Sequence, residues 1–477
     1  MTDPAPSVGE TAPHNPGSSA PDLGMRHPDV RDVMKVAADR NVMKVAADRD
    51  VEVAIVGGGM VGMTLAIALA GAGVETAVID AAPAAERTAA VYDGRSSAIA
   101  LGSQRVFAGI GLWPSLERDA QPILDIRVSD GKPEDRRLGP AASHLFLHYD
   151  HRAVSDAARA IGAEDAPFGW IIENRAIRRA LVAQASQLRS LAHIAPTTVV
   201  NETLERGHVR LALGDGTSLR ARLVVAADGR GSKMRESRKI PATQWRYTQT
   251  GIVCTVTHEF SHEGVAHEHF LPAGPFAVLP MVDDAHGHRS SIVWTERETL
   301  APAMMALDDD AFSAEMTRRF GTSLGALRII GEGINRGRWS YPLGVLHASR
   351  YVDERMALIG DAAHAIHPIA GQGLNLGLRD VAALAETIVD ARRLGLDLGV
   401  GEPLERYARW RRVDNLLLIA ATDSLNRLFA NDIAPLRIAR DMGLAAVDRM
   451  PAVKRFFMRH AMGIVGELPR LVRGEGL

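Results

Sequence analysis

The sequence predicts a mixed α/β fold, because two kinds of segment alternate along the chain and a third follows them. Three buried strands each run into a glycine-containing turn, which is typical of a parallel-sheet, nucleotide-binding domain. Gln244–Ser340 is instead rich in strand-forming residues, as in VCTVTHEF, PFAVLPMV and SSIVWTE. From about Glu402 the pattern is typical of helices. We therefore expect a Rossmann-like domain interleaved with a β-sheet domain, followed by a helical C-terminus.

Composition limits the class of protein. The chain of 477 residues is long enough for two or three domains. Its content of 46% hydrophobic and 23% charged residues is ordinary for a globular protein. A net charge of −2 argues against a nucleic-acid interface, which requires a strongly basic face. The only cysteine, Cys254, excludes a disulfide framework, argues against a cysteine-ligated metal and fits a reducing, cytoplasmic compartment.

The first 48 residues are expected to be disordered. Residues 1–30 are rich in Pro, Gly and Ser and contain no apolar stretch that could serve as a signal peptide. Arg31–Asp39 then recurs as Arg40–Asp48, a repeat too short for a solenoid unit. We interpret this repeat as a tandem duplication beside the start of the folded domain.

The first glycine motif predicts a dinucleotide-binding βαβ unit. A buried strand (Glu52–Val56), a helix (about Met60–Ala72) and a second strand (Val74–Ile79) surround a GxGxxG pattern. Its glycines are Gly57, Gly59 and Gly62. The first makes the turn, the second lets a pyrophosphate approach the backbone, and the third lets the helix pack closely. Asp80 ends the second strand, where a carboxylate can accept hydrogen bonds from an adenosine ribose. This motif does not distinguish NAD from FAD.

Two later segments favour FAD. One strand leads into Asp228-Gly229, and another, Arg355–Gly360, leads into Asp361 and a proline-glycine loop before a helix. Asp361 is a candidate for binding the ribityl hydroxyls. The amides of Gly371–Asn375, at the positive end of that helix, are candidates for stabilising negative charge on a reduced flavin. No His/Cys/Asp cluster has metal-site spacing, and we interpret His364 and His367 as loop-packing residues.

The chain resembles the ubiquinone-biosynthesis hydroxylases, a family of FAD-dependent aromatic hydroxylases related to para-hydroxybenzoate hydroxylase. The resemblance extends from about Val51 to the C-terminus. It rests on the three turns and on six stretches. These are DGRSSAIA (Asp93–Ala100), GLW (Gly111–Trp113), ENRAIRRAL (Glu173–Leu181), WRYTQTGIV (Trp245–Val253), FLPAGPFAVLPM (Phe270–Met281) and LIGDAAHAIHPIAGQGLNLGLRD (Leu358–Asp380).

The resemblance, together with the motifs, implies a set of FAD contacts. They are Gly57, Gly59, Gly62, Asp80, Arg95, Asn174, Asp228, Gly229, Gly360, Asp361, Pro368, Gly371, Gly373, Leu374 and Asn375. Asp80 departs from the family pattern, in which glutamate is commoner, so the detail of the ribose contact is open. No second GxGxxG follows a strand, and NAD(P)H is therefore expected as a transient co-substrate at the flavin.

The expected domains are interleaved. Residues 49–122, 151–243 and 341–399 would form the FAD-binding domain, 123–150 and 244–340 the β-sheet substrate domain, and 400–477 the C-terminal helices. Four residues of the sheet domain are candidates for lining a substrate cavity, with ordinary sheet core as the alternative. They are Trp245, Tyr247, Phe270 and Pro280.

These features predict an FAD-dependent monooxygenase that hydroxylates the ring of a polyprenylated phenol in ubiquinone biosynthesis. O2 would react with reduced flavin to give a hydroperoxide, with NAD(P)H as reductant. The flavin carries this chemistry, so no catalytic protein residue is expected. The alternatives are hydroxylation of a soluble phenol, a flavin reductase that never uses O2, a halogenase of related fold, and an FAD-stabilised scaffold of a biosynthetic complex.

The C-terminal part combines basic residues with apolar ones. The basic residues are Arg427, Arg437, Arg440, Arg449, Lys454, Arg455 and Arg459, and the apolar ones Leu428, Phe429, Phe456, Phe457, Met458 and Met462. Such helices can lie on membrane surfaces, although a helix packed on its own domain has the same stripe. The expected location is cytoplasmic, with peripheral contact to the inner membrane or a biosynthetic complex as a further hypothesis.

Overall fold

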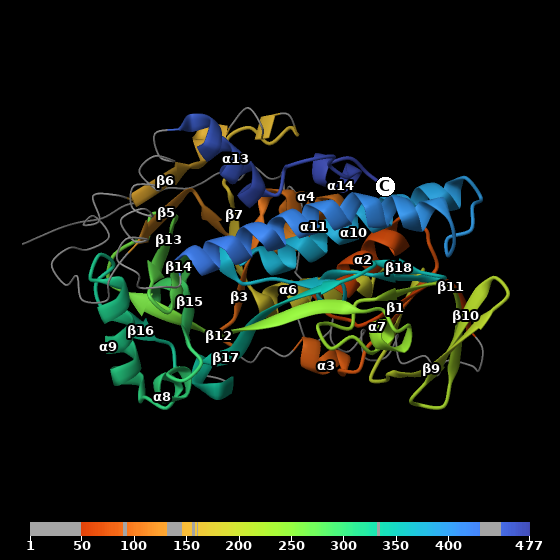
Figure 1. The fold of residues 1–477 in the computed structure, drawn as a ribbon, viewed down its shortest axis with the longest axis horizontal. Coiled ribbons are helices and arrows are strands. Elements are labelled where there is room, and N and C mark those ends of the chain that lie inside the picture. The colour runs from red at the N-terminus through yellow and green to blue at the C-terminus, as the bar shows by residue number, and fades with distance from the viewer. Residues whose placement is uncertain are drawn as a thin grey trace, which may run out of the picture. The chain divides into compact units, whose positions relative to one another are not determined.

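The glycine-rich βαβ unit forms and starts a mostly parallel sheet (Figure 1). β1 (Arg49–Val56) is followed by α2 (Met60–Gly71) and β2 (Thr76–Ile79), and the two strands pair in parallel. The structure, a computed structural model, describes residues 49–88, 93–130, 146–154, 158–159, 161–331, 334–429 and 450–477. The segment predicted to be disordered and its repeat, residues 1–48, lie outside the described residues.

Strands from distant parts of the chain complete this sheet in the order β18-β19-β11-β1-β2-β8, and β10 and β9 extend it from β11. Their bounds are β8 (Leu191–Ile194), β9 (Val199–Glu205), β10 (His208–Leu213), β11 (Ser218–Ala226), β18 (Val352–Asp353) and β19 (Met356–Leu358). The last residues of three parallel strands, Val56, Ala226 and Leu358, lie side by side. The three turns that the sequence singled out therefore meet at one edge of the sheet.

The core of this part lies between the sheet and its helices. α2 is apolar on all sides, and its residues from Gly62 to Ala70 are buried between the strands and neighbouring helices. A helix with no polar face packs in an interior. The two helices it contacts are α6 (Asn174–Ala185) and α10 (Gln372–Arg393).

A second sheet of nine strands has the order β20-β17-β12-β15-β14-β13-β5-β6, with β16 paired to β12. The bounds are β5 (Asp125–Asp130), β6 (Phe146–Asp150), β12 (Ala242–His258), β13 (Val265–Leu271), β14 (Gly274–Asp284), β15 (Gly287–Arg297), β16 (Arg328–Ile329), β17 (Trp339–Ala348) and β20 (His364–Ala365). Strand alternation places apolar residues on both faces of its centre. One face packs against α8 (Ala301–Met305) and α9 (Asp309–Phe320), with Trp294 and Phe312 fully buried between them.

The predicted fold class is confirmed, because the two sheets exchange segments along the chain. β5 and β6, from the segment 123–150, join the nine-stranded sheet beside β13. β17 runs across the boundary expected at residue 340, since one strand spans both sides of it. The exact domain limits stay a prediction. Residues 131–145 of the first sheet-domain segment lie outside the described residues.

A small third sheet, in the order β3-β7-β4, contacts β14 of the nine-stranded sheet and the helices α6 and α10 that pack with α2 on the mostly parallel sheet. The bounds are β3 (Ser96–Ala100), β4 (Gln121–Ile123) and β7 (Gly169–Glu173), and the helices not yet named before the C-terminal part are α3 (Ala84–Arg87), α4 (Leu101–Gly109) and α7 (Lys233–Ser237). β3 contacts α10, so this sheet forms a third wall beside the two large sheets.

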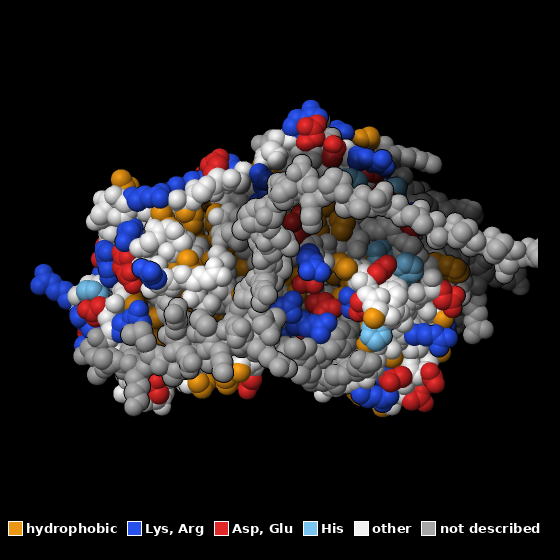
Figure 2. All heavy atoms as spheres, turned by 180° about the vertical axis from the view of Figure 1, so that it is seen from behind, with side chains coloured by type: hydrophobic (Ala, Val, Ile, Leu, Met, Phe, Trp, Pro, Cys, Tyr) orange, Lys and Arg blue, Asp and Glu red, His pale blue; other side chains and the backbone are white. Residues whose placement is uncertain are grey.

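The C-terminal part is helical, as predicted. It comprises α11 (Glu402–Phe429), α13 (Pro451–Met462) and α14 (Arg470–Arg473), and α11 runs beside α10 (Figure 1). Arg437, Arg440 and Arg449 lie outside the described residues. No helix in the described ranges is both long and apolar enough to cross a membrane. On the face shown in Figure 2, acidic and basic side chains are interspersed, in keeping with the net charge of −2.

Candidate active site

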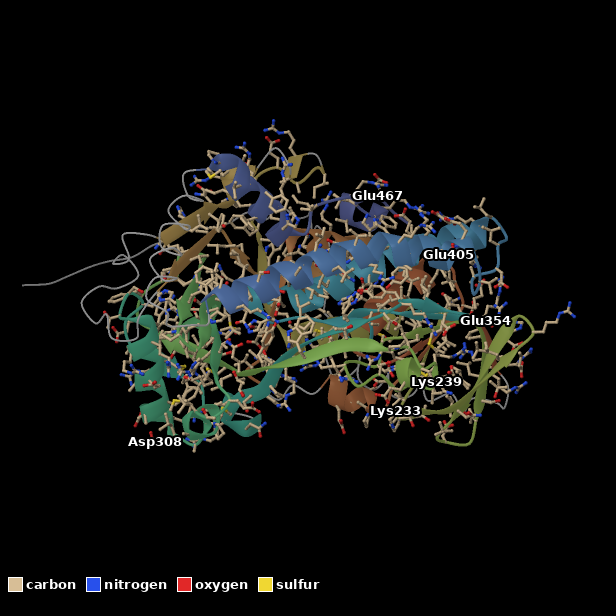
Figure 3. The ribbon with its side chains drawn as sticks, in the orientation of Figure 1. Lys233, Lys239, Asp308, Glu354, Glu405 and Glu467 are labelled. Carbon is tan, nitrogen blue, oxygen red and sulfur yellow. The ribbon has the colours of Figure 1, made fainter. Side chains whose placement is uncertain are left out.

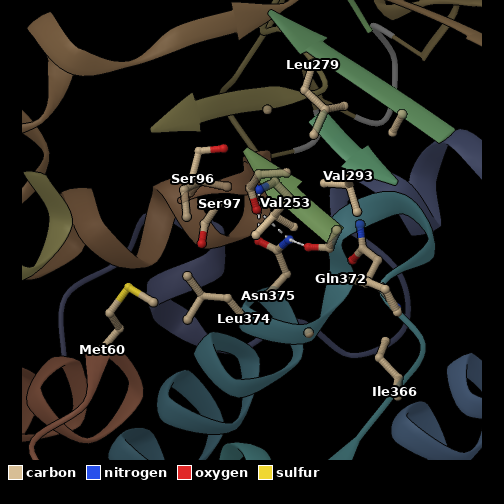
Figure 4. A pocket seen from close by; sticks show the side chains of 18 of the residues that line it. Met60, Ser96, Ser97, Val253, Leu279, Val293, Ile366, Gln372, Leu374 and Asn375 are labelled. Atoms are coloured by element: carbon tan, nitrogen blue, oxygen red, sulfur yellow. Dashed lines mark hydrogen bonds between the residues drawn. The ribbon is translucent and has the colours of Figure 1, made fainter. Parts of the chain in front are cut away.

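A cavity of about 530 Å³ lies where the three sheets meet. Its floor comes from the turns after β1, β11 and β19, and its opposite wall from the nine-stranded sheet. Figure 4 shows this arrangement: Val253, Leu279 and Val293 point from strands of the sheet toward Leu374, Asn375 and Gln372 of the loop and helix opposite. Chain segments separated by hundreds of residues thus enclose one space.

The three glycines of the first motif meet three different surroundings. A side chain at Gly57 would clash with the Ala227 carbonyl, and the backbone there has φ +111°, in the region that favours glycine. A side chain at Gly62 would clash with the Gly57 carbonyl. Gly59 has no protein atom near the place of its absent side chain, and it lines the cavity. The structure therefore leaves room for a ligand at the second glycine only.

Two helices begin at the cavity without a side-chain cap. α2 starts after Gly59 and α10 after Gly371, and neither N-cap residue has a side chain to accept the first N–H groups. Gly371 has φ +61°, a conformation that costs glycine little. Because helix N-termini carry unpaired N–H groups and partial positive charge, both are suited to anionic groups of a ligand.

Asp361 presents a carboxylate to the same space. The side chain of Asp361 is exposed to the cavity, but the protein around the cavity partly withdraws it from bulk water, which raises the pKa of Asp361, while the positive charge of Arg230 acts in the opposite direction. Hydroxyl groups of a ligand would provide the hydrogen bonds that such a carboxylate accepts.

Asn375 fixes the loop rather than reaching for a ligand. Its Nδ2 donates to the carbonyls of Ala98 (2.9 Å) and Gly371 (3.0 Å), and its Oδ1 accepts from the N–H of Ala100 (2.9 Å). The side chain is almost fully buried. Both donors and one of the two acceptor sites of the amide therefore hold β3 against the start of α10.

A buried polar network supports the turn after β19 from below. The Asp380 carboxylate accepts from His364 Nε2 (2.6 Å), from the N–H of Gly360 (3.0 Å) and from Arg411 Nε on α11 (2.8 Å). Burial by itself raises the pKa of Asp380, but His364 and Arg411 outweigh it and hold the pKa at about 2. The network thus joins α10, α11 and the Gly360-Asp361 turn.

The two histidines of this loop are structural. His364 donates from Nε2 to the Asp380 carboxylate, and His367 is fully buried with its Nδ1 accepting from the N–H of Ile369 (3.3 Å) and its ring 5.3 Å from that of Tyr247. Burial lowers the pKa of His367 to about 4, so it is neutral at pH 7. Among the described residues, no group of three or more His, Cys, Asp or Glu side chains is arranged to hold a metal.

Comparison with known proteins agrees with this geometry. The model of the FAD binding domain family matches residues 50–394. Ubiquinone hydroxylase UbiL of Rhodospirillum rubrum is 51% identical over 429 residues, which cover 89% of this chain and 93% of that protein. The chain belongs to the ubiquinone-biosynthesis hydroxylases. It is an FAD-dependent monooxygenase of that family.

Two further relatives fit this assignment. The 3-demethoxyubiquinol 3-hydroxylase of Escherichia coli is 31% identical over 415 residues, or 87% of this chain and 98% of that protein. The crystal structure of p-nitrophenol 4-monooxygenase from Pseudomonas putida superposes with a TM-score of 0.70 at 19% identity, covering 88% of this chain and 99% of that one. The latter likeness concerns the fold.

The cavity fits FAD. The open backbone at Gly59 and the N-terminus of α2 suit the pyrophosphate, Asp361 suits the ribityl hydroxyls, and the uncapped start of α10 suits the electron-rich edge of the flavin ring. Bound FAD supplies the redox and oxygen-transfer chemistry of this hydroxylase. The chain supplies position, complementary charge and exclusion of water.

Eight of the fifteen predicted FAD contacts line the cavity. They are Gly59, Gly229, Asp361, Pro368, Gly371, Gly373, Leu374 and Asn375. The other seven stand behind the wall or beside it. They are Gly57, Gly62, Asp80, Arg95, Asn174, Asp228 and Gly360. The contacts of all fifteen residues with FAD stay predictions, and the four polar side chains among the seven have defined protein partners.

Those partners explain the positions of the four polar residues. The Asp80 carboxylate accepts from Arg87 (2.8 and 2.9 Å) and from the N–H of Ala82 (3.2 Å). Arg95 pairs with Asp93 (3.0 Å), and its guanidinium lies 4.4 Å from the ring centre of Trp339. Asn174 Oδ1 accepts from Ser97 Oγ (2.7 Å), and Ser97 lines the cavity. Asp228 accepts from the N–H of Met234 (3.2 Å).

The four residues proposed from sequence to line a substrate cavity lie beside this one. Trp245 and Tyr247 donate to Asp423 of α11 (3.3 and 2.5 Å), and Tyr247 borders a separate surface cleft. Phe270 stacks on Phe429, with ring centres 4.1 Å apart. Pro280 is buried on the strand face opposite Leu279. A substrate contact for any of them stays a prediction.

Several residues of the cavity were not singled out from the sequence. Arg230 and Tyr341 line it beside Asp361, and Glu268 lines it on β13. Arg230 directly follows the Asp228-Gly229 turn, so its position in the motif was a usable signal. For Tyr341 and Glu268 the alternation of each strand predicts two faces, but not which face meets the cofactor.

Proposed function

We propose that this enzyme hydroxylates the aromatic ring of a polyprenylated phenol on the route to ubiquinone, using FAD, O2 and NAD(P)H. The observation that carries the proposal is the pairing of the cofactor cradle with an apolar wall. Val253, Leu279 and Val293 present aliphatic side chains to the cavity opposite the start of α10, and Ala277 lines the same cavity. A flat, greasy ring fits between such surfaces.

The chain's own part in the reaction follows from these walls. Aliphatic side chains exclude water from the cavity, which would protect reactive intermediates from hydrolysis and strengthens electrostatic interactions there. The N-terminus of α10 favours negative charge on the ring system held against it. The relatives named as ubiquinone hydroxylases support the choice of a quinone precursor as substrate.

The proposal is tested by isotope labelling. Purified enzyme loaded with FAD is given NAD(P)H, ¹⁸O₂ and a polyprenylphenol, and the mass of the product is measured by mass spectrometry. We expect a gain of one ¹⁸O atom on the ring. Label taken from water overturns the mechanism. Label that enters only a soluble phenol without a prenyl chain keeps the mechanism and rejects the substrate.

Peripheral contact with a lipid surface is part of the proposal. Part of the C-terminal stripe is buried, since Met458 and Met462 belong to the core, but Phe456 and Phe457 are exposed beside Arg455. α11 also exposes a row of apolar side chains. A substrate with a long prenyl chain resides in the membrane, so an enzyme that takes it benefits from binding there.

A further inference from the structure

One row of residues across the sheet wall carries two hydroxyl groups. Tyr341 of β17 and Thr295 of β15 are both in register with Gly251 of β12, the strand that lies between them in the nine-stranded sheet. Directly paired residues of an antiparallel sheet point to the same face. Tyr341 and Thr295 both line the cavity, so this row belongs to the wall that faces the cofactor cradle.

Gly251 makes room for the ring of Tyr341. A Cβ atom added at Gly251 would lie 3.1 Å from Cζ of Tyr341, the ring carbon that bears the hydroxyl. The Tyr341 ring therefore lies across the glycine, along the wall, and 38% of the residue is exposed. Within the part of the chain that the structure describes, the Tyr341 hydroxyl makes no hydrogen bond. It is therefore available to a ligand in the cavity.

The second hydroxyl of the row also lacks a protein partner. Thr295 directs its methyl group toward Gly274, where an added Cβ would lie 2.5 Å from Thr295 Cγ2. Its Oγ1 is buried and has no hydrogen-bond partner among the described residues. A buried polar group without a partner is costly. This end of the wall is therefore polar, and its hydrogen-bonding capacity is not satisfied within the protein.

The next row along the same strands is apolar. Val253 and Val293 are paired with each other two residues from Gly251 and Thr295, and they point toward the start of α10 (Figure 4). An aromatic ring held against these two valines is thus one row away from the Tyr341 hydroxyl. The wall combines an apolar area for the ring with a hydroxyl group at the edge of that area.

The Tyr341 hydroxyl is a donor at neutral pH. Burial raises the pKa of Tyr341, while the positive charges of Arg230 and Arg95 act in the opposite direction. The net shift is upward from an ordinary value of 10.0, so the phenol group keeps its proton at pH 7. A protonated tyrosine hydroxyl can donate to an oxygen atom of a ligand.

We propose that Tyr341 donates a hydrogen bond to the oxygen substituent of the substrate ring and so determines how the ring is oriented against the flavin. The inference rests on the proposed function for the identity of the ligand. Val253 and Val293 contact the face of the ring but do not distinguish its edges. The Tyr341 hydroxyl distinguishes them, because a ring without an oxygen at this place leaves the donor unpaired.

The test compares two ligands that differ in one ring substituent. A phenol with a short prenyl chain, and its analogue with a methyl group in place of the hydroxyl, are titrated into the oxidised, FAD-loaded enzyme. Binding is followed by the change in flavin absorbance. We expect the wild type to prefer the phenol by about tenfold. Tyr341→Phe should lose most of this preference, because phenylalanine keeps the ring but donates no hydrogen bond.

A matched control uses the same substitution in the same sheet. Tyr149 of β6 is not among the residues that line the cavity, so Tyr149→Phe should keep the full preference. Both variants should retain FAD, and loss of FAD from Tyr341→Phe would place the hydroxyl at the cofactor and overturn the inference.

The remaining outcomes separate this contact from the proposed function. An unchanged preference in Tyr341→Phe, or no preference in the wild type, overturns the inference even where ring hydroxylation proceeds. A preference that is lost in Tyr341→Phe, without ring hydroxylation by the wild type, upholds the contact and rejects the proposed reaction.

Discussion

Gly59 and Gly62 belong to one motif but differ in what a methyl group would meet. Gly59→Ala adds it to open space in the cavity, and Gly62→Ala drives it into the Gly57 carbonyl. We expect Gly59→Ala to leave the apoprotein as stable as the wild type and to weaken FAD binding. Gly62→Ala should destabilise the fold by about 3 kcal/mol, at the upper end for overpacking. Thermal melts of apoprotein and FAD titration separate the two effects, and equal losses of stability would contradict this assignment.

Asp361 combines a benefit in binding with a cost in stability. Asp361→Ala should lose most of the FAD, whereas Glu354→Ala, at the exposed turn between β18 and β19 (Figure 3), should keep it. In the apoprotein the raised pKa of Asp361 means that its charge destabilises the fold at neutral pH, and that this cost disappears as pH falls through the raised pKa.

Asp361→Asn tests that second effect. The apoprotein of the variant should melt above the wild type at pH 7, and the difference should shrink as the pH is lowered toward the carboxyl range, because protonated Asp361 resembles asparagine. A variant that melts below the wild type at pH 7 would show that the charge is compensated. Full FAD occupancy in Asp361→Ala would reject Asp361 as a cofactor contact.

At the scale of single residues, the sequence predicted which residues lie at the cavity better than it predicted the hydrogen bonds that their side chains make. The glycine pattern and Asp361 follow from the chemistry of a phosphate and a sugar chain, and the structure places Gly59 and Asp361 in the cavity. Asn375 lines the cavity and its contact with the flavin stays a prediction, but its polar atoms hold β3 and Gly371. Its partner Ala98 is far away in sequence, and no local pattern specifies such a contact.

Among the elements, α10 depends on the buried carboxylate of Asp380, which accepts hydrogen bonds from His364 and Arg411. Removing the charge in Asp380→Asn leaves Arg411 without one of its two acidic partners, Asp380 and Asp414. Breaking a buried pair in this way costs about 3–5 kcal/mol. We expect a marked loss of thermal stability, whereas Glu402→Gln in the exposed pair with Arg409 should cost less than about 1 kcal/mol.

The pH dependence gives this prediction a sign. The pKa of Asp380 is about 2 in the folded protein against 3.8 without the fold. A lowered carboxyl pKa contributes stability above its unfolded value and loses it as the pH falls toward the folded value. The difference between wild type and Asp380→Asn should therefore be full above about pH 4 and narrow below it. If the difference in stability between wild type and Asp380→Asn stayed constant as the pH fell below about 4, the loss would come from altered packing and not from the lost charge.

Elements with strong local signals were predicted closely. The helix expected at about Met60–Ala72 is α2 (Met60–Gly71), and the C-terminal helix expected from about Glu402 begins at Glu402. The strand expected at Arg355–Gly360 is only Met356–Leu358, because Gly360 adopts φ +57° to enter the turn. β17 crosses the expected domain boundary at residue 340. The sequence did not predict this crossing, because the residues of β17 do not show that the strand pairs with β12 on both sides of that boundary.

Taken as a whole, the molecule interleaves its sheets so that one site is built from most of the chain. The edges of β1, β11 and β19 contribute the cradle, and the nine-stranded sheet contributes the wall. The order of segments was predictable from the alternation of motifs and strand-rich stretches. The pairing of β5 with β13 was not, because the partners of a parallel pair are chosen by distant contacts.

The exposed apolar row of α11 leads to a prediction about where the enzyme works. Val413, Leu416, Leu417 and Leu428 are 63%, 43%, 63% and 43% exposed, with Arg412 and Arg427 beside them. We expect the enzyme to sediment with anionic liposomes at low salt and to be released at high salt, since salt screens the attraction of the basic side chains.

Leu416→Ser with Leu417→Ser should weaken liposome binding about tenfold, because less apolar area enters the lipid. The matched control, Val200→Ser with Leu204→Ser on β9, changes side chains that are 64% and 43% exposed and should bind like the wild type. If both double variants bound liposomes equally well, α11 would not be the element that contacts the lipid. If the enzyme did not sediment with liposomes even at low salt, peripheral binding would be rejected.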